Sequence, residues 1–356
     1  MQSKKFTVQL MRWNNEENER QMPWKGVKDP YKVWLSEVIL QQTRVEQGWP
    51  YYERFTQQYP TIEALAAAKD EAVFKLWEGL GYYSRCRNLL SAARTIVKEY
   101  GGIFPRDYDA ILALKGIGPY TASAVASFCF DLPHAVVDGN VFRVLSRVFG
   151  VNLAIDSTAG KKYFSDLAAQ VLDEEDPGTF NQAIMDFGAT VCKPALPACS
   201  GCSLSNICNA FATGRVNLLP IKEKSITKKK RWFSYFIFEH DGKVLVRKRT
   251  MKDIWQNLYE YFIVETEADP RWNEDSVNDF MTTQLASSGY NIVSVIFADK
   301  QQLTHQTIHG YFITVTLTIV PAVLLRDEYR WLSKKQISRL AFPGFINQHF
   351  QNKRPA

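Results

Sequence analysis

The spacing of apolar residues divides this chain into a helical first part and a strand-rich second part. Up to about residue 212, apolar residues recur with the period of a helix; the clearest stretches are 33–40, 62–68, 72–77 and 89–97. From Trp232 onward apolar and polar positions alternate, which predicts strands over 232–238, 244–249, 292–297 and 311–319. Only 273–286 returns to helical spacing there, so we expect a helical domain followed by a small α+β domain.

Residues that end helices and open loops mark the boundaries. Thr61 and Asp70 are expected N-caps, and Gly101-Gly102 is an expected helix stop. Gly214, Pro220 and a lysine-rich run predict an exposed basic linker. The predicted organisation is a helical domain over 1–212, a basic linker over 213–231 and a second domain over 232–356.

Composition describes an ordinary globular protein. Of the 356 residues, 46% are hydrophobic and 22% are charged, and the net charge of +6 allows an anionic partner without requiring one. No apolar run of about 18 residues predicts a membrane span, and the N-terminus lacks a secretory apolar core. We therefore expect a cytoplasmic protein without membrane contact, and a monomer.

Four closely spaced cysteines form the strongest candidate site, with the pattern Cys192-x6-Cys199-x2-Cys202-x5-Cys208. Zinc and a 4Fe–4S cluster are both held by four cysteines. Structural zinc sites more often pair two CxxC elements, whereas Cys199 and Cys202 form the single such element here, which favours the cluster. A pair of disulfides is the third interpretation, and a reducing compartment disfavours it.

A glycine-containing turn is the second candidate site. In LKGIGPYTAS, a predicted helix over 108–115 meets Gly116-Ile117-Gly118, and Pro119 suits the first turn of a helix over 120–128. The free N–H groups of such a turn and of the following helix bind anions. The pattern resembles a helix-hairpin-helix, which holds a DNA backbone phosphate without reading sequence; a simple interhelical turn is the alternative. The expected phosphate contacts are Lys115, Gly116 and Gly118.

Glu37 is an acid inside an otherwise apolar helix, VWLSEVILQQT. Burial of a carboxyl group is costly unless it is paired or protonated, and it raises the pKa, which suits a general acid. Gln41 and Arg44 follow at i+4 and i+7, so we expect all three on one helix face that forms a pocket wall. A buried glutamate with a purely structural role is an equally good interpretation of this segment alone.

Asp138 is a second acid, placed between the apolar run 135–137 and a predicted helix over 141–149. We expect it to cap that helix, and we expect the helix N–H groups to lower its pKa. One carboxyl with a raised pKa and one with a lowered pKa form the pair that breaks glycosidic bonds. The acid protonates the leaving group and the anion stabilises the cationic sugar.

Together these segments resemble the helix-hairpin-helix DNA glycosylases with an iron–sulfur cluster, most closely the adenine glycosylases of the MutY type. The resemblance covers nearly the whole chain. It implies an all-helical glycosylase domain with a helix-hairpin-helix at 108–128 and a 4Fe–4S loop at 192–208, followed by a Nudix-like α+β domain. It also implies the reaction: removal of adenine opposite 8-oxoguanine or guanine in double-stranded DNA.

The resemblance assigns roles residue by residue. Glu37 matches the general acid, Asp138 the catalytic aspartate, and Asn140 a residue that orients Glu37 or the water. The positions that match the family's adenine pocket or its DNA contacts are Arg20, Trp24, Gln41, Gln42, Tyr82 and Gln182.

Tyr120 lies where related enzymes that also cut the strand carry a lysine, whose amine forms a Schiff base with the sugar. A phenol cannot form that imine. We therefore include Tyr120 in the catalytic site and expect a monofunctional glycosylase, which hydrolyses the bond with water and leaves an abasic site.

The second domain lacks the Gly- and Glu-rich box with which Nudix hydrolases bind magnesium, since Tyr259-Glu260-Tyr261-Phe262 offers one acid. We interpret it as a module that recognises oxidised guanine. Leu303-Thr304-His305 falls where the family has Phe-Ser-His. Thr304 and His305 remain candidate contacts, whereas Leu303 lacks a stacking ring, so we expect altered discrimination. Trp255-Gln256-Asn257-Leu258 also departs from the glycine expected there.

Three other functions fit parts of the sequence. A mismatch glycosylase acting on thymine shares the helical domain, but Gln182 and the second domain argue against it. A non-catalytic DNA-damage sensor would not need both Glu37 and Asp138. A zinc-bound nucleic-acid module would use the same four cysteines without an iron–sulfur cluster.

Overall fold

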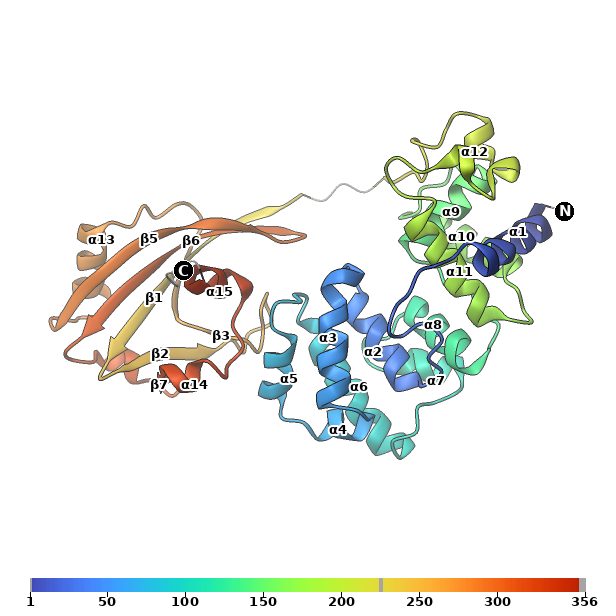
Figure 1. Ribbon diagram of the computed structural model, residues 1–356. Helices are drawn as coiled ribbons and strands as arrows, with labels where there is room; N and C mark the ends of the chain where they lie inside the picture. The colour runs from blue at the N-terminus through green and yellow to red at the C-terminus, as the bar shows by residue number, and fades with distance from the viewer. Residues whose placement is uncertain (1, 224–226, 352–356) are drawn as a thin grey trace. The chain divides into compact units, whose positions relative to one another are not determined.

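The computed structural model describes residues 2–223 and 227–351 and forms two compact units (Figure 1). The first unit comprises Met1–Ala67 and Arg87–Lys224, and the second comprises Ala68–Cys86 and Ser225–Ala356. Residues 68–86, from the helical part of the sequence, thus belong to the strand-rich unit. The boundaries 1–212, 213–231 and 232–356 stay predictions, and residues 224–226 of the linker lie outside the described residues.

The first unit is helical. Its longer helices are α1 (Gln2–Glu16), α2 (Pro30–Leu40), α3 (Val45–Gln58), α6 (Ser84–Tyr100), α8 (Pro119–Phe130), α9 (Gly139–Phe149), α10 (Thr158–Val171) and α11 (Pro177–Thr190). Its shorter helices are α4 (Ile62–Ala67), α7 (Tyr108–Ala113), η1 (Cys199–Gly201), η2 (Ser205–Ile207) and α12 (Asn209–Ala212). A core that includes Phe6, Val144 and Phe180 joins α1, α9 and α11. The predicted helices of this unit are confirmed.

The structure confirms two of the predicted helix signals and corrects two others. Thr61 accepts a hydrogen bond from the Ala64 N–H (3.3 Å), and Gly101 and Gly102 follow α6 with φ of +62° and +83°. Asp70 was expected to cap α5 (Asp70–Trp77), but Lys69 is the N-cap and Asp70 is the first helical residue. Nor do Glu37, Gln41 and Arg44 share a helix face, because α2 ends at Leu40 and Arg44 precedes α3.

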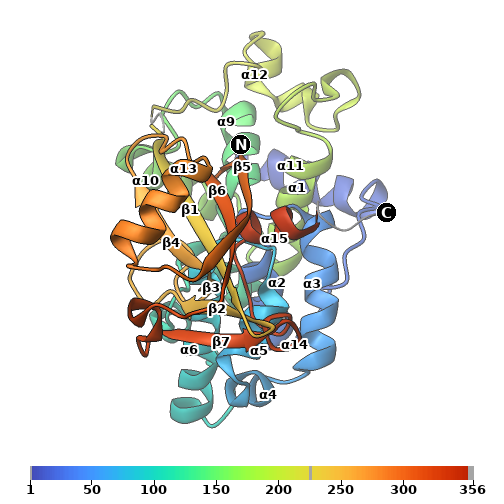
Figure 2. The ribbon, with the colours of Figure 1, turned by 90° about the vertical axis from the view of Figure 1, so that its left-hand side faces the viewer.

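The second unit is built on a mixed sheet (Figures 1 and 2). Its strands are β1 (Lys229–His240), β2 (Lys243–Lys248), β3 (Tyr259–Glu260), β4 (Phe262–Thr266), β5 (Tyr290–Gln302), β6 (Gln306–Leu317) and β7 (Tyr329–Ser333). The order is β3-β2-β1-β6-β5, with β4 on β1 and β7 on β2, and only β1 and β6 pair in parallel. At Gly310 a Cβ would lie 1.9 Å from the Phe233 carbonyl oxygen, so glycine allows β6 to approach β1.

Helical segments pack on both faces of this sheet. The helices of the second unit are α5, α13 (Glu274–Asp279), η3 (Phe280–Gln284), η4 (Ala322–Leu325), α14 (Lys334–Ile337) and α15 (Gly344–Gln351). Phe236 of β1 stacks on Phe280 of η3 (4.6 Å between centroids), whereas the neighbouring Tyr235 faces Phe345 of α15. Because successive strand residues point to opposite faces, the two helical segments cover opposite sides. The four strands and the helix predicted here are confirmed; β3, β4, β7 and the last two helices were missed.

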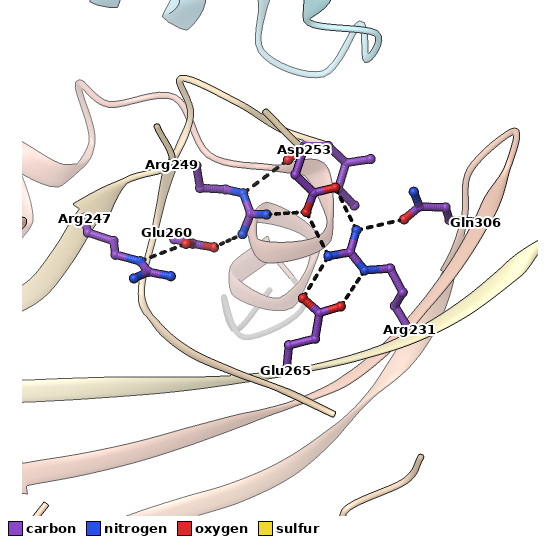
Figure 3. Close-up of polar contacts among 8 residues, drawn as sticks. Arg231, Arg247, Arg249, Asp253, Glu260, Glu265 and Gln306 are labelled. Carbon is purple, nitrogen blue, oxygen red and sulfur yellow. Dashed lines mark hydrogen bonds and ion pairs between the residues drawn. The ribbon is translucent and has the colours of Figure 1, made fainter. Parts of the chain in front are cut away.

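A cluster of ion pairs connects the sheet to the loop after β2 (Figure 3). Its members are Arg231, Arg247, Arg249, Asp253, Glu260 and Glu265. Arg231 is buried and pairs with Asp253 (2.8 Å) and Glu265 (2.6 Å), so the prediction that it belongs to an exposed linker is wrong. Glu260, the single acid of the YEYF segment, is buried between Arg247 and Arg249. Its carboxylate is thus neutralised by arginines.

Residues 68–86 are attached to the second unit by polar contacts. Glu71 pairs with Lys248 (3.0 Å), and this hydrogen bond lowers the pKa of the Glu71 carboxyl. Farther along, the Glu78 carboxylate accepts the Phe342 N–H (2.8 Å). Among helices within 2–223 and 227–351, none has the length and apolar content of a membrane span.

Candidate active site

A cavity of about 490 Å³ in the first unit collects most of the predicted site residues. Its walls come from α2, α8, α9, α11 and the segment before α2. Of the residues singled out in the sequence, those that line it are Arg20, Trp24, Glu37, Gln41, Gln42, Tyr120, Asp138, Asn140 and Gln182. Residues up to about 160 positions apart in the sequence therefore line one cavity. The volume of this cavity suits a small ligand.

Glu37 lies in this cavity wall with 5% of its surface exposed. Burial raises the pKa of its carboxyl to about 7, and the nearby Asp138 charge adds to the rise. The Tyr120 hydroxyl donates a hydrogen bond to Glu37 Oε2 (2.6 Å), which opposes the rise. Burial and Glu37 also raise the pKa of the Tyr120 phenol, so it stays a donor. The sequence prediction of a buried glutamate with a raised pKa is confirmed.

Asp138 is the N-cap of α9, as predicted. Its Oδ1 accepts the N–H groups of Asn140 and Val141, both at 2.8 Å, and its Oδ2 accepts the Asn140 side-chain amide at 2.8 Å. The expected lowering of its pKa is wrong, however. Loss of water around the carboxyl raises the pKa of Asp138, and these donors oppose that rise without reversing it.

The end of α2 shapes the mouth of the cavity. The Gln41 N–H bonds to the Glu37 carbonyl as the C-cap, and the Gln41 side-chain amide donates to Thr121 Oγ1 on α8 (3.2 Å). Gln42 then turns the chain with φ of +58°, in the left-handed region that non-glycine residues rarely adopt. This turn leaves Gln42 exposed at the cavity. Gln41 and Gln42, which the resemblance assigned to the adenine pocket or to DNA contacts, thus both line the cavity.

Arg143 of α9 supports the Asp138 end of the site, and no pattern in the sequence indicated this role. Its guanidinium donates to Asn140 Oδ1 (2.8 Å), the Gly188 carbonyl (2.6 Å) and the Cys192 carbonyl (2.7 Å). A Cβ at Gly188 would lie 2.6 Å from Asn140, so glycine lets α11 approach the start of α9. Asn140 therefore orients Asp138; no contact between Asn140 and Glu37 is present among the bonds of the described side chains.

Asp186 is a second residue that sequence reasoning missed. It lies one helical turn after Gln182 on α11, is fully buried, and accepts salt bridges from Arg20 (2.8 Å) and Lys25 (2.9 Å). Lys25 and Gln182 also line a smaller cavity of about 170 Å³, which shares Glu37 and Trp24 with the larger one. The sequence contained one indication of this contact: in NQAIMDFGATVC, Asp186 follows Gln182 by four positions, which places both side chains on one helix face.

The four cysteines of the 192–208 segment surround one small pocket between α9 and α11, which Phe187 and Arg147 also line. All six cysteines are free thiols, which excludes the two-disulfide interpretation for this structure. The Arg147 guanidinium lies 3.4 Å from Cys192 Sγ, a favourable position for a thiolate. Within the described part of the chain, no three Cys, His, Asp or Glu side chains converge closely enough to hold a single metal ion.

The predicted helix-hairpin-helix is present as α7 and α8, and its glycine-containing turn at 115–118 is not part of the cavity lining. Gly116 has φ of +83°, and a Cβ there would lie 2.5 Å from Asn88, so both conformation and space require glycine. Gly118 is the N-cap of α8 without a side chain, Pro119 begins the helix, and Lys115 is exposed. The N–H groups that start α8 are therefore open to an anion.

The remaining predicted contacts belong to the second unit. The Tyr82 hydroxyl shares a hydrogen bond with Thr304 Oγ1, and Tyr82 has φ of +46°. Thr304 and His305 form the tip of the β5–β6 hairpin, where the His305 carbonyl accepts the Lys229 N–H (3.0 Å). The structure thus brings Tyr82 and Thr304 together, a pairing that the sequence analysis did not predict.

Comparisons with known proteins agree with this architecture. The family model of HhH-GPD superfamily base excision DNA repair proteins matches residues 35–168, and that of the NUDIX domain matches residues 234–352. A solved thermostable thymine-DNA glycosylase aligns with a TM-score of 0.55 and 30% identity over 60% of this chain and 97% of that one. An endonuclease III–DNA complex, at 21% identity and a TM-score of 0.52 over the same shares, supports the fold alone.

The chain therefore belongs to the HhH-GPD superfamily of base excision DNA repair proteins. The adenine DNA glycosylase of Buchnera aphidicola subsp. Baizongia pistaciae is 34% identical over 312 residues, 85% of this chain and 84% of that protein. Within the superfamily, the chain is therefore a member of the adenine DNA glycosylase family. The human adenine DNA glycosylase is 44% identical over 214 residues, 58% of this chain but 39% of that protein. The protein is thus a DNA glycosylase, an enzyme that hydrolyses N-glycosidic bonds.

The buried Glu37 predicts an unusual dependence of stability on pH. A folded-state pKa of about 7 against an ordinary value of 4.5 means that the contribution of this carboxyl to stability is fully present below pH 4.5 and is lost as pH rises through 7. Glu37→Gln keeps the shape without the charge. We expect it to be about 2–3 kcal/mol more stable than the wild type above pH 7, with the gain shrinking toward pH 4.5.

Chemical denaturation across this pH range measures the difference. Glu99→Gln, an exposed position on α6, is the matched control and should show no such trend. A Glu37→Gln gain that stays the same at all pH values would show that the carboxyl does not titrate as described.

Proposed function

We propose that this enzyme is a monofunctional glycosylase that excises adenine opposite 8-oxoguanine or guanine, with Glu37 as general acid. The observation that carries the proposal is the pairing of two carboxyls on one cavity. Glu37 has a pKa of about 7, within reach of neutral pH, and Asp138 is surrounded by N–H donors that favour its anion. Such a pair suits the cleavage of a bond to a sugar.

The proposed reaction begins with extrusion of adenine from the duplex into the cavity, because the reacting bond is inaccessible within the base stack. Glu37 in its protonated form donates to N7 of adenine, and the bond between N9 and the sugar breaks with its electron pair on the base. The Asp138 carboxylate stabilises the cationic sugar. Water then attacks the sugar carbon and gives its proton to Glu37, which restores the acid and leaves an abasic site.

Tyr120 and Asn140 are proposed to hold these carboxyls in place. The Tyr120 hydroxyl fixes Glu37 through the 2.6 Å hydrogen bond, and the phenol cannot form a Schiff base with the sugar. Asn140, itself held by Arg143, fixes Asp138. Arg20, Trp24, Gln41, Gln42 and Gln182 are proposed to surround the flipped base and the distorted duplex.

DNA outside the cavity is proposed to contact two further places. Lys115, Gly116, Gly118 and the α8 N-terminus would hold a backbone phosphate. Tyr82, Thr304 and His305 would contact the base opposite the adenine, and the Tyr82–Thr304 hydrogen bond supports a shared role for them.

The four cysteines are proposed to hold a 4Fe–4S cluster, which is larger than a single ion and suits thiols arranged around a pocket. A bound cluster would supply iron–thiolate bonds that stabilise the 192–208 segment. Cys192, Cys199, Cys202 and Cys208 would be the ligands, and Arg147 would balance thiolate charge.

Single-turnover base release from matched duplexes tests the substrate. The duplexes carry adenine opposite 8-oxoguanine, adenine opposite guanine, adenine opposite thymine, and thymine opposite guanine. We expect adenine release to be fastest opposite 8-oxoguanine, thymine to be retained, and strands to break only after alkali treatment. Release of thymine would favour the activity named for the thymine-DNA glycosylase relative, and strand cleavage without alkali would exclude a monofunctional enzyme.

Glu37→Gln tests the acid. The amide preserves size and accepts the Tyr120 hydrogen bond, but it cannot give up a proton to adenine. We expect it to bind the duplex with near wild-type affinity and to release adenine slower by at least about 10²-fold. Near-normal release by this variant, measured at saturating enzyme, would contradict the role of Glu37.

A further inference from the structure

The Gln182 side chain has two hydrogen-bonding ends that face different surroundings. Its amide nitrogen lies 3.3 Å from Asp186 Oδ1, whereas the residue itself lines both cavities beside Glu37. No protein donor reaches its Oε1 among the hydrogen bonds of the described residues. Because a carboxylate is acceptor-only, the amide must turn its NH2 toward Asp186, which leaves Oε1 directed away from it.

Asp186 is itself held firmly. Its side chain is 0% exposed and accepts four donors: Asn18 (3.1 Å), Arg20 (2.8 Å), Lys25 (2.9 Å) and Gln182. Two of these are cations, so the buried carboxylate is paired and satisfied. A carboxylate held in this way cannot rotate away from the Gln182 amide, so it remains an acceptor for the Gln182 NH2.

We propose that Asp186 is a positioning residue that sets which bases the pocket accepts. By taking the Gln182 NH2, it makes Oε1 the acceptor that faces the flipped base. That acceptor favours a base with an exocyclic amino group, such as adenine, and disfavours hypoxanthine, whose 6-keto oxygen would oppose Oε1. This inference rests on the proposed function, since it assumes that the flipped base occupies this cavity.

The test compares adenine with hypoxanthine, each placed opposite 8-oxoguanine, by single-turnover base release. Asp186→Asn allows Gln182 to turn, because an asparagine can donate as well as accept. We expect the adenine-to-hypoxanthine rate ratio to fall by about tenfold, the effect of one polar contact. Intrinsic nucleoside reactivity cancels when this ratio is compared between variants.

Matched variants separate positioning from a general structural effect. Asp166→Asn makes the same charge change on the exposed face of α10 and should keep the wild-type ratio. Gln182→Met removes the amide, so Asp186→Asn added to it should leave the ratio unchanged. Equal slowing of both bases by Asp186→Asn would overturn the proposal, because it would show only a structural role.

Two further variants keep the test decisive if Asp186→Asn does not fold. The double variant Asp186→Asn, Lys25→Met removes both charges of the Lys25–Asp186 ion pair, so it does not leave the lysine without its partner. We expect the same fall in the adenine-to-hypoxanthine ratio. Gln182→Met with Asp186 intact should also lower the ratio, and an unchanged ratio there would overturn the proposal. Wild-type enzyme that releases no adenine would instead refute the proposed function itself.

Discussion

The removal of water from the Glu37 carboxyl is the constraint on which the site depends. An ionised carboxylate in water would be a poor acid at neutral pH, and burial in the apolar helix α2 raises its pKa to about 7. The cost of that burial is lowered by the Tyr120 hydroxyl, which donates to the carboxyl at 2.6 Å. The tyrosine thus keeps the acid in place and limits the rise of its pKa.

Asp138, in contrast, must act as an anion in the proposed reaction, and hydrogen-bond donors around its carboxylate support that charged form. The start of α9 surrounds this carboxyl with N–H groups, and Asn140 and Arg143 extend the support to the Gly188 and Cys192 carbonyls. Burial nevertheless raises the pKa of Asp138. The two acids therefore differ less in the direction of their pKa changes than in their partners: one phenol for Glu37, and several amide N–H groups for Asp138.

Patterns within short segments of the sequence predicted the features that depend on neighbouring residues, namely the secondary structure and the burial of a single side chain. The period of apolar residues placed the helices and the longer strands, and a lone acid in an apolar helix correctly indicated a buried Glu37. Arg44 was misplaced because nothing in QQT signals that Gln42 would adopt φ of +58° and end α2. The pKa of Asp138 was misjudged because a cap visible in the sequence says nothing of how much water the fold removes.

Contacts between distant residues were beyond the reach of such patterns. Arg231 appeared to continue a lysine-rich run, yet it is buried because Asp253 and Glu265 meet it from other segments. Nothing in the sequence around Asp186 indicates its ion pairs, because its partners Arg20 and Lys25 lie far away near the start of the chain. Spacing reveals periodicity, whereas these pairings depend on tertiary packing.

The most direct test is the pH dependence of single-turnover adenine release at saturating enzyme. A protonated Glu37 requires the rate to fall about tenfold per pH unit above about pH 7. Because the Tyr120 hydrogen bond lowers the pKa of Glu37, the profile of Tyr120→Phe should fall at a higher pH than that of the wild type. A rate that is flat through this range, or a Tyr120→Phe profile without a shift, would contradict the account.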